Sequence, residues 1–173
     1  MAAALAFLLS AGLLFSAAPA PRANPAQSHD AAASDPRLQG SYRFEEGGWI
    51  YVHLGGSPEK IGYQHGYLLA DEIRDAVAAV SLDSTYRTKR DWAFFRETAE
   101  KILWPQIDEE YRQELSAIAA GVNARSPQKT PVDVWDIVAL NAFEEVPDYY
   151  VPVLNAREHR PNPPLARRGP ERF

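Results

Sequence analysis

Apolar and polar residues alternate in two short runs near the start of the central region, Tyr42–Phe44 and Trp49–Leu54. Both runs are rich in aromatic and β-branched residues, and the segment between them contains Gly47 and Gly48. Two such runs joined by a glycine-containing turn are typical of a β-hairpin. Because the second run has large side chains at alternate positions on both sides of the strand, we expect both faces of the hairpin to be at least partly covered.

After the hairpin the apolar residues recur every three or four positions, which is the spacing of amphipathic helices. The first helix is predicted to begin with Ser57 as N-cap and Pro58 at the first helical position, and to continue to about Val80. Further helices are expected over residues 91–103, 107–122 and 130–146. The sequence therefore predicts an α+β fold that is mainly α, with a short β-hairpin followed by about four helices.

Small residues recur every four positions in the first of these helices, at Gly62, Gly66 and Ala70. A glycine inside a helix costs about 0.8–1 kcal/mol relative to alanine, so glycines at this spacing indicate a ridge that another backbone or a ligand approaches closely. Close packing against a neighbouring helix or strand is the favoured interpretation. His65 lies beside the ridge and would border a cleft under the ligand interpretation, whereas His53 is interpreted as a packed or interfacial histidine.

The last predicted helix has a start signal in Thr130 as N-cap and Pro131 at the first helical position. Pro147 is expected to end it near Val146, because proline cannot continue the helical hydrogen-bond pattern. Almost every residue from 134 to 143 is apolar. This helix is therefore expected to lie inside the domain.

Two polar residues of this last helix are candidate site residues. Asn141 is expected to be a buried amide, which costs about 1–3 kcal/mol if it is left unpaired and so requires specific partners. Glu144 follows three residues later, on the same helical face, where both side chains could border a pocket. The alternative is a core helix with one satisfied asparagine and a solvated acidic end.

Composition narrows the classes of protein that remain. The chain has 173 residues, 46% of them hydrophobic, which fits one globular domain. The net charge of −5 and the lack of a basic run in the central region argue against a nucleic-acid binder. There is no cysteine, so disulfides, thiolate metal sites and a cysteine nucleophile are excluded within this chain. No two histidines stand at metal-ligand spacing, and no cofactor or metal is predicted.

The two ends differ from the middle. The eleven-residue apolar run Leu5–Phe15 is too short for a stable membrane span and suits a signal peptide over residues 1–20, which predicts export to the periplasm or the exterior. An uncleaved anchor or a misassigned start is the alternative, because no Lys or Arg precedes the run. Residues 21–39 are interpreted as a flexible linker. The Arg/Pro-rich tail, 156–173, is either disordered or translated out of frame.

Three stretches together resemble a known family: residues 40–73, which include SPEKIGYQHG, residues 94–125, and residues 133–155, which include ALNAFEEVPDYY. They resemble the amino-terminal region of the bacterial self-processing amidohydrolases and acyltransferases related to isopenicillin-N acyltransferase, a group that also includes phospholipase-B-like proteins. The resemblance implies an N-terminal-nucleophile (Ntn) hydrolase, in which two β-sheets lie between helical layers. Residues 40–155 would be the part that precedes the self-cleavage site and packs against the catalytic region.

The resemblance also carries implications for activity. Asn141 and Glu144 match the family's N-x-x-E spacing and would be substrate-binding, while Phe143 stands where the acyltransferase branch often has Arg. The nucleophilic cysteine should follow Asn155, but residues 156–173 contain no Cys, Ser or Thr. The chain alone is therefore expected to be inactive. Its expected partners are the missing catalytic region and an acyl amide or lipid-like substrate. The alternative from another class is a stand-alone helical binding module without catalysis.

Overall fold

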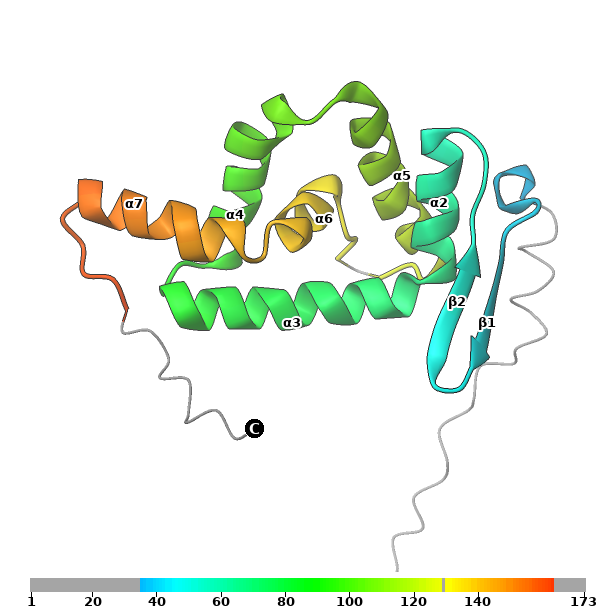
Figure 1. The fold of residues 1–173 in the computed structure, drawn as a ribbon, viewed down its shortest axis with the longest axis horizontal. Coiled ribbons are helices and arrows are strands. Elements are labelled where there is room, and N and C mark those ends of the chain that lie inside the picture. The colour runs from blue at the N-terminus through cyan, green and yellow to red at the C-terminus, as the bar shows by residue number, and fades with distance from the viewer. Residues whose placement is uncertain (1–34, 129, 164–173) are drawn as a thin grey trace, which may run out of the picture.

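The computed structural model describes residues 35–128 and 130–163, a mainly helical body with a β-hairpin at one end (Figure 1). The predicted hairpin and helical character are confirmed, but six α-helices follow the hairpin where about four were expected. The strands are β1 (Tyr42–Glu46) and β2 (Trp49–His53). The helices are α2 (Pro58–Leu68), α3 (Ala70–Thr88), α4 (Trp92–Thr98), α5 (Glu109–Arg125), α6 (Val134–Asn141) and α7 (Val151–Arg157).

The hairpin closes through the two-residue turn Gly47-Gly48, with φ of 60° and 83°. Positive φ at both central residues is the signature of a type I′ turn, which glycine adopts without steric cost. The strands pair antiparallel, with Glu46 opposite Trp49 and Tyr42 opposite His53. Every residue of both strands is exposed, so the prediction that both faces are covered is wrong for the described chain.

The glycine ridge packs α2 directly against α5, as the favoured interpretation predicted. A Cβ on Gly66 would lie 1.9 Å from the carbonyl oxygen of Ile118, and one on Gly62 would lie 2.1 Å from that of Glu114. Gly121 on α5 contributes to the same close contact, because a Cβ at this position would lie 2.2 Å from the carbonyl oxygen of Tyr63. The two backbones touch because neither helix carries a side chain at these points.

The single helix predicted from Ser57 to about Val80 is in fact two helices. The chain turns at Leu69, which has φ −118° and ψ 28°, and Figure 1 shows α2 and α3 running in different directions. The turn lets the two helices pack differently. The α2 helix packs along α5, whereas α3 contributes Ile73 to a core shared with α5 and α6. Hydrophobic spacing alone does not reveal such a bend.

The last predicted helix begins later and ends earlier than expected. Its N-cap is Asp133, whose carboxylate accepts from the backbone N–H of Trp135 and Asp136, while the Asp136 carboxylate accepts from the N–H of Asp133. This reciprocal capping box satisfies more backbone donors than a threonine N-cap at Thr130 would, and it leaves Pro131 outside the helix. The helix ends at Asn141 rather than near residue 146.

Pro147 does not end the helical conformation of the chain, contrary to the prediction. It lies inside the π-helical turn Glu145–Tyr150, which leads directly into α7. Because proline lacks an N–H, a place in the first turn of a new helix costs it no hydrogen bond. A second π-helical turn, Ala99–Leu103, extends α4 and places the fully buried Ala99 against α6.

The predicted domain boundaries are only partly within the described residues. The signal peptide, 1–20, and linker residues 21–34 lie outside them. Residues before the predicted boundary at Gly40 are already packed, because the 3₁₀ turn Pro36–Leu38 places Leu38 against Tyr63 on α2. At the other end α7 continues through Arg157, two residues into the predicted tail, and residues 164–173 lie outside the described part. None of the described helices is long and apolar enough to cross a membrane.

Candidate functional site

Asn141 and Glu144 are placed at the surface, and the prediction that Asn141 is buried is wrong. Asn141 is the last residue of α6, where its Nδ2 donates to the carbonyl oxygen of Ile137 at 2.9 Å. Glu144 is exposed just before the π-helical turn, and its carbonyl oxygen accepts from the N–H of Asp148 at 3.0 Å. Because α6 ends between them, they do not share a helical face. Their substrate-binding role stays a prediction.

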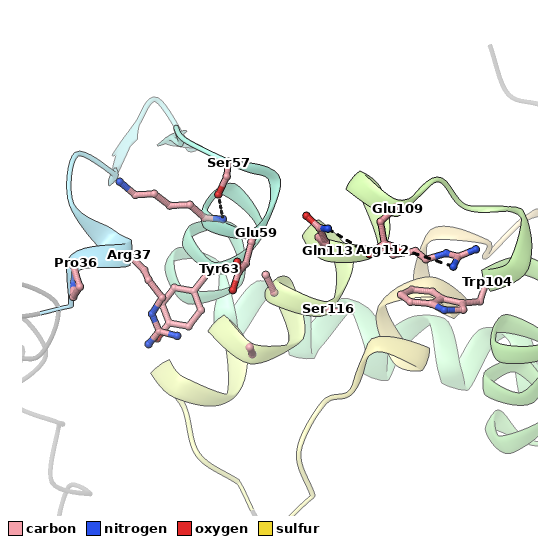
Figure 2. A pocket seen from close by; sticks show the side chains of 13 residues that line it. Pro36, Arg37, Ser57, Glu59, Tyr63, Trp104, Glu109, Arg112, Gln113 and Ser116 are labelled. Carbon is pink, nitrogen blue, oxygen red and sulfur yellow. Dashed lines mark hydrogen bonds and ion pairs between the residues drawn. The ribbon is translucent and has the colours of Figure 1, made fainter.

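A groove of about 750 Å³ lies between α2 and α5 and is here called the α2–α5 groove. Figure 2 shows Arg37 and Tyr63 at one end of it and Arg112 and Trp104 at the other. Neither Asn141 nor Glu144 lines the groove. The α2–α5 groove is therefore separate from the site that the sequence predicted.

At each end of the α2–α5 groove, an arginine side chain lies over an aromatic ring. The Arg37 guanidinium lies 3.6 Å from the centre of the Tyr63 ring, and that of Arg112 lies 5.4 Å from the centre of the Trp104 ring. Two serines, Ser57 and Ser116, also line the groove, but no histidine is among its lining residues. The hydroxyls therefore lack the imidazole base that usually activates such a nucleophile.

A clamp of Asp35, Arg37 and Tyr63 holds the first described residues against α2. The Asp35 carboxylate accepts from the Arg37 guanidinium at 2.8 Å and from the Tyr63 hydroxyl at 3.0 Å. The Arg37 guanidinium lowers the pKa of Asp35 to about 2, helped by the backbone N–H of Arg37 and by Tyr63. Burial and the bond to Asp35 raise the pKa of Tyr63 to about 12.

This clamp predicts a specific acid sensitivity. The pKa of Asp35 is lower in the folded chain, at about 2, than its usual value of 3.8, so its stabilising effect is complete above pH 3.8 and is lost as the pH falls through about 2. Replacing Asp35 by Asn should remove this part of the acid dependence of the unfolding free energy. Asp75→Asn is the control, because Asp75 is exposed on α3. Urea titrations at several pH values check this, and equal acid profiles for the two variants would contradict it.

Gln64 is a fully buried amide that the sequence analysis did not single out. Its Nε2 donates to the carbonyl oxygens of Arg37 and Gly55 at 2.8 and 3.2 Å, and its Oε1 accepts from the N–H of Gly55 at 2.8 Å. One side chain thus ties the clamp segment, the exit of the hairpin and α2 together. Its polar character on the packed side of a helix was a signal in the sequence, because a buried amide implies specific partners.

Charged residues also gather where α6 begins. The Arg96 guanidinium pairs with the carboxylates of Asp133 and Asp136, and the Trp92 indole N–H donates to Asp136 at 2.8 Å. Asp136 is buried, and these bonds compensate its charge. Because the same two carboxylates form the capping box, the cluster fixes the start of α6 rather than offering free ligands. Within residues 35–128 and 130–163, no three metal-ligating side chains gather into a possible metal site.

His53 and His65 have different surroundings. His53 is exposed on β2 and stacks on Tyr42 with 5.0 Å between ring centres, so it is not packed in the interior of the described residues, and an interfacial role stays a prediction. His65 is partly buried beside the glycine ridge, and burial lowers its pKa although Glu114 opposes the shift. Neither histidine lines the α2–α5 groove. In comparisons with protein-family models, curated proteins and solved structures, the chain has no significant match.

Proposed function

We propose that this chain is the amino-terminal, non-nucleophile part of an exported amidohydrolase or acyltransferase of the Ntn type, which transfers or hydrolyses acyl groups at amide or ester bonds. The family resemblance of residues 40–155 suggests the class. The observation that carries the proposal is the hairpin, whose two strands expose aromatic and aliphatic side chains on both faces. In this proposal the catalytic region covers the two faces of the hairpin.

A two-stranded hairpin without further cover is marginally stable in water. Trp49 is 72% exposed and Tyr42 is 54% exposed, so much of the apolar surface of β1 and β2 is accessible to solvent. Strands with apolar side chains on both faces are typical of sheets covered on both sides. The two-sheet, four-layer arrangement of the Ntn fold provides such cover, which is why the hairpin supports this proposal.

The helical body has unpartnered apolar residues as well. Leu82 and Tyr86 stand four residues apart on one face of α3 and are 74% and 70% exposed. Tyr149 and Val153, near and in α7, are also exposed. Large contiguous apolar patches are rare on monomeric soluble proteins, and the proposal assigns these side chains to contacts with the catalytic region.

The proposal also assigns a role to Asn141 and Glu144. Both are exposed at the end of α6, where the chain approaches the segment that precedes the predicted cleavage junction. Within the described residues the carboxamide oxygen of Asn141 has no hydrogen-bond donor, so it is available to a substrate or to the catalytic region. We propose them as substrate-binding positions of the completed enzyme, which would act on an acyl amide or lipid-like substrate.

Binding of the fluorescent dye ANS by the purified full chain tests this proposal. We expect strong ANS fluorescence under native conditions, because the hairpin and α3 expose apolar surface that the catalytic region would cover. Trp49→Ser and Leu82→Ser should each lower the signal, whereas Ser116→Ala, which leaves these surfaces unchanged, is the control. A chain that binds no ANS and unfolds cooperatively as a monomer would contradict the proposal.

That contradicting result would favour a second function, a stand-alone helical binding module. The observation in its favour is the closed core of the helical body, in which Phe95, Val122 and Ile137 are almost fully buried. Such a core could fold without further layers. The module would use the α2–α5 groove as its contact surface, and the ANS experiment separates the two functions.

A further inference from the structure

We propose that the free edge of β2 pairs with the β2 edge of a second copy of this chain, forming a continuous four-stranded antiparallel sheet across a two-fold axis. The inference does not rest on the proposed function, because it follows from the hairpin's own geometry. It concerns the edge of the hairpin, through its backbone groups, and not the faces that carry the exposed side chains.

The turn determines which backbone groups point outward. In a two-residue type I′ hairpin the residues that flank the turn form a hydrogen-bonded pair, so Glu46 and Trp49 exchange both bonds. Pairs then alternate between bonded and non-bonded along the ladder, which makes Glu45–Ile50 and Arg43–Val52 non-bonded pairs. The N–H and C=O groups of Ile50 and Val52 therefore point away from β1, toward the free edge.

These outward groups lie symmetrically about Tyr51, which makes the edge complementary to itself. If Tyr51 faces Tyr51 of the partner chain across a two-fold axis, each Ile50 lies opposite a Val52, and these residues exchange both of their backbone bonds. The side chains then pair aliphatic with aliphatic and aromatic with aromatic. Trp49 falls opposite His53 in the same register. No charged residue meets another across this edge.

The two edges of the hairpin differ in their charged residues. The residues of β2 are Trp, Ile, Tyr, Val and His, with no Lys, Arg, Asp, Glu or Pro to discourage strand addition. The edge of β1 carries Arg43 and Glu45, which pair with each other at 2.8 Å, and Arg43 also pairs with Glu72 on α3 at 2.6 Å. Covering those charges with another strand would remove their water, which is costly. The second copy is therefore expected on β2.

Proline variants on opposite strands test the edge with a matched control. Ile50→Pro removes an outward N–H from β2, and Glu45→Pro removes the corresponding outward N–H from β1, while both leave the hairpin ladder intact. In sedimentation equilibrium from about 5 to about 500 µM, the native chain and Glu45→Pro should dimerise, and Ile50→Pro should raise the dissociation constant at least about tenfold. Ile50→Lys gives a second edge variant and should behave like Ile50→Pro.

Disulfide trapping tests the register directly, since the chain has no cysteine of its own. Tyr51→Cys places a thiol beside its symmetry mate in a non-bonded pair, where Cβ atoms are close enough for a disulfide, so oxidation should give a covalent dimer. Phe44→Cys on β1 should remain monomeric. A monomeric native chain at the highest concentration, or equal effects of the two proline variants, would overturn the inference. Association that is unaffected by Ile50→Pro but accompanied by ANS binding would overturn it while leaving the proposed function standing.

Discussion

Gly66→Ala should destabilise the chain by about 3 kcal/mol or more, through overpacking at the contact of α2 with α5. The added Cβ would lie 1.9 Å from the carbonyl oxygen of Ile118, and a backbone atom cannot move aside as the end of a flexible side chain can. Alanine gains about 1 kcal/mol of helix propensity over glycine, which is too little to offset the clash. Urea unfolding followed by far-UV circular dichroism measures the difference.

Gly55→Ala is the matched control for this prediction. A Cβ on Gly55 meets nothing within 4 Å, and its backbone does not require glycine, so the same chemical change should alter the unfolding free energy by less than about 0.5 kcal/mol. A Gly66→Ala variant as stable as Gly55→Ala would contradict this prediction. The α2 and α5 backbones would then be further apart at Gly66 than the structure shows.

Gln64→Leu should lower the free energy of unfolding by about 2–4 kcal/mol. The substitution keeps the volume but removes every hydrogen bond of the Gln64 side chain, which leaves the Arg37 carbonyl and the Gly55 N–H and carbonyl without it. Each buried group left unpaired costs about 1–3 kcal/mol, and access of water to some of these groups keeps the total below the sum. The same urea titration measures the loss.

Gln113→Leu makes the same chemical change on the exposed side of α5, where the amide donates to Glu109 at 3.3 Å. We expect a change within about 0.5 kcal/mol. Hydrogen exchange adds a local test, because Gln64→Leu should accelerate exchange of the Gly55 amide more than that of amides in α6. Similar effects of the two variants on stability would show that Gln64 does not tie the three segments together.

Local signals predicted the parts of the fold that local chemistry decides. The alternating runs and Gly47-Gly48 gave the hairpin, and Ser57-Pro58 gave the start of α2, because each depends on residues a few positions apart. The four-residue glycine spacing also predicted the close helix contact correctly. These features are settled by backbone preferences and by steric limits that a sequence shows directly.

Features that depend on distant neighbours were missed. The bend at Leu69 separates two helices with different partners, and the sequence does not name those partners. The start of α6 followed the capping box of Asp133 and Asp136, which is tied to Arg96 from α4, instead of the stronger-looking Thr130-Pro131 signal. The different packing partners of α2 and α3 decided the first boundary, and a local capping box reinforced by Arg96 decided the second.

The candidate site was the least predictable part. Asn141 was expected to be buried because apolar residues precede it, but α6 ends at Asn141 and leaves the side chain at the surface. The α2–α5 groove combines residues from the clamp, α2, α5 and Trp104, so no local pattern marks it. Gln64 had a local signal, a polar residue on a packed helical face, but its partners lie in two other segments.

The central claim is that this chain is the amino-terminal part of an Ntn-type hydrolase or acyltransferase. Sequencing the gene and translating the DNA after codon 155 in all three frames tests this claim most directly. The account predicts a frame that continues into a Cys-Ser-Ala-like junction and then into strand-rich sequence, which would supply the nucleophile and the layers that cover the faces of the hairpin. If no frame encodes such a junction, the enzymatic proposal is contradicted.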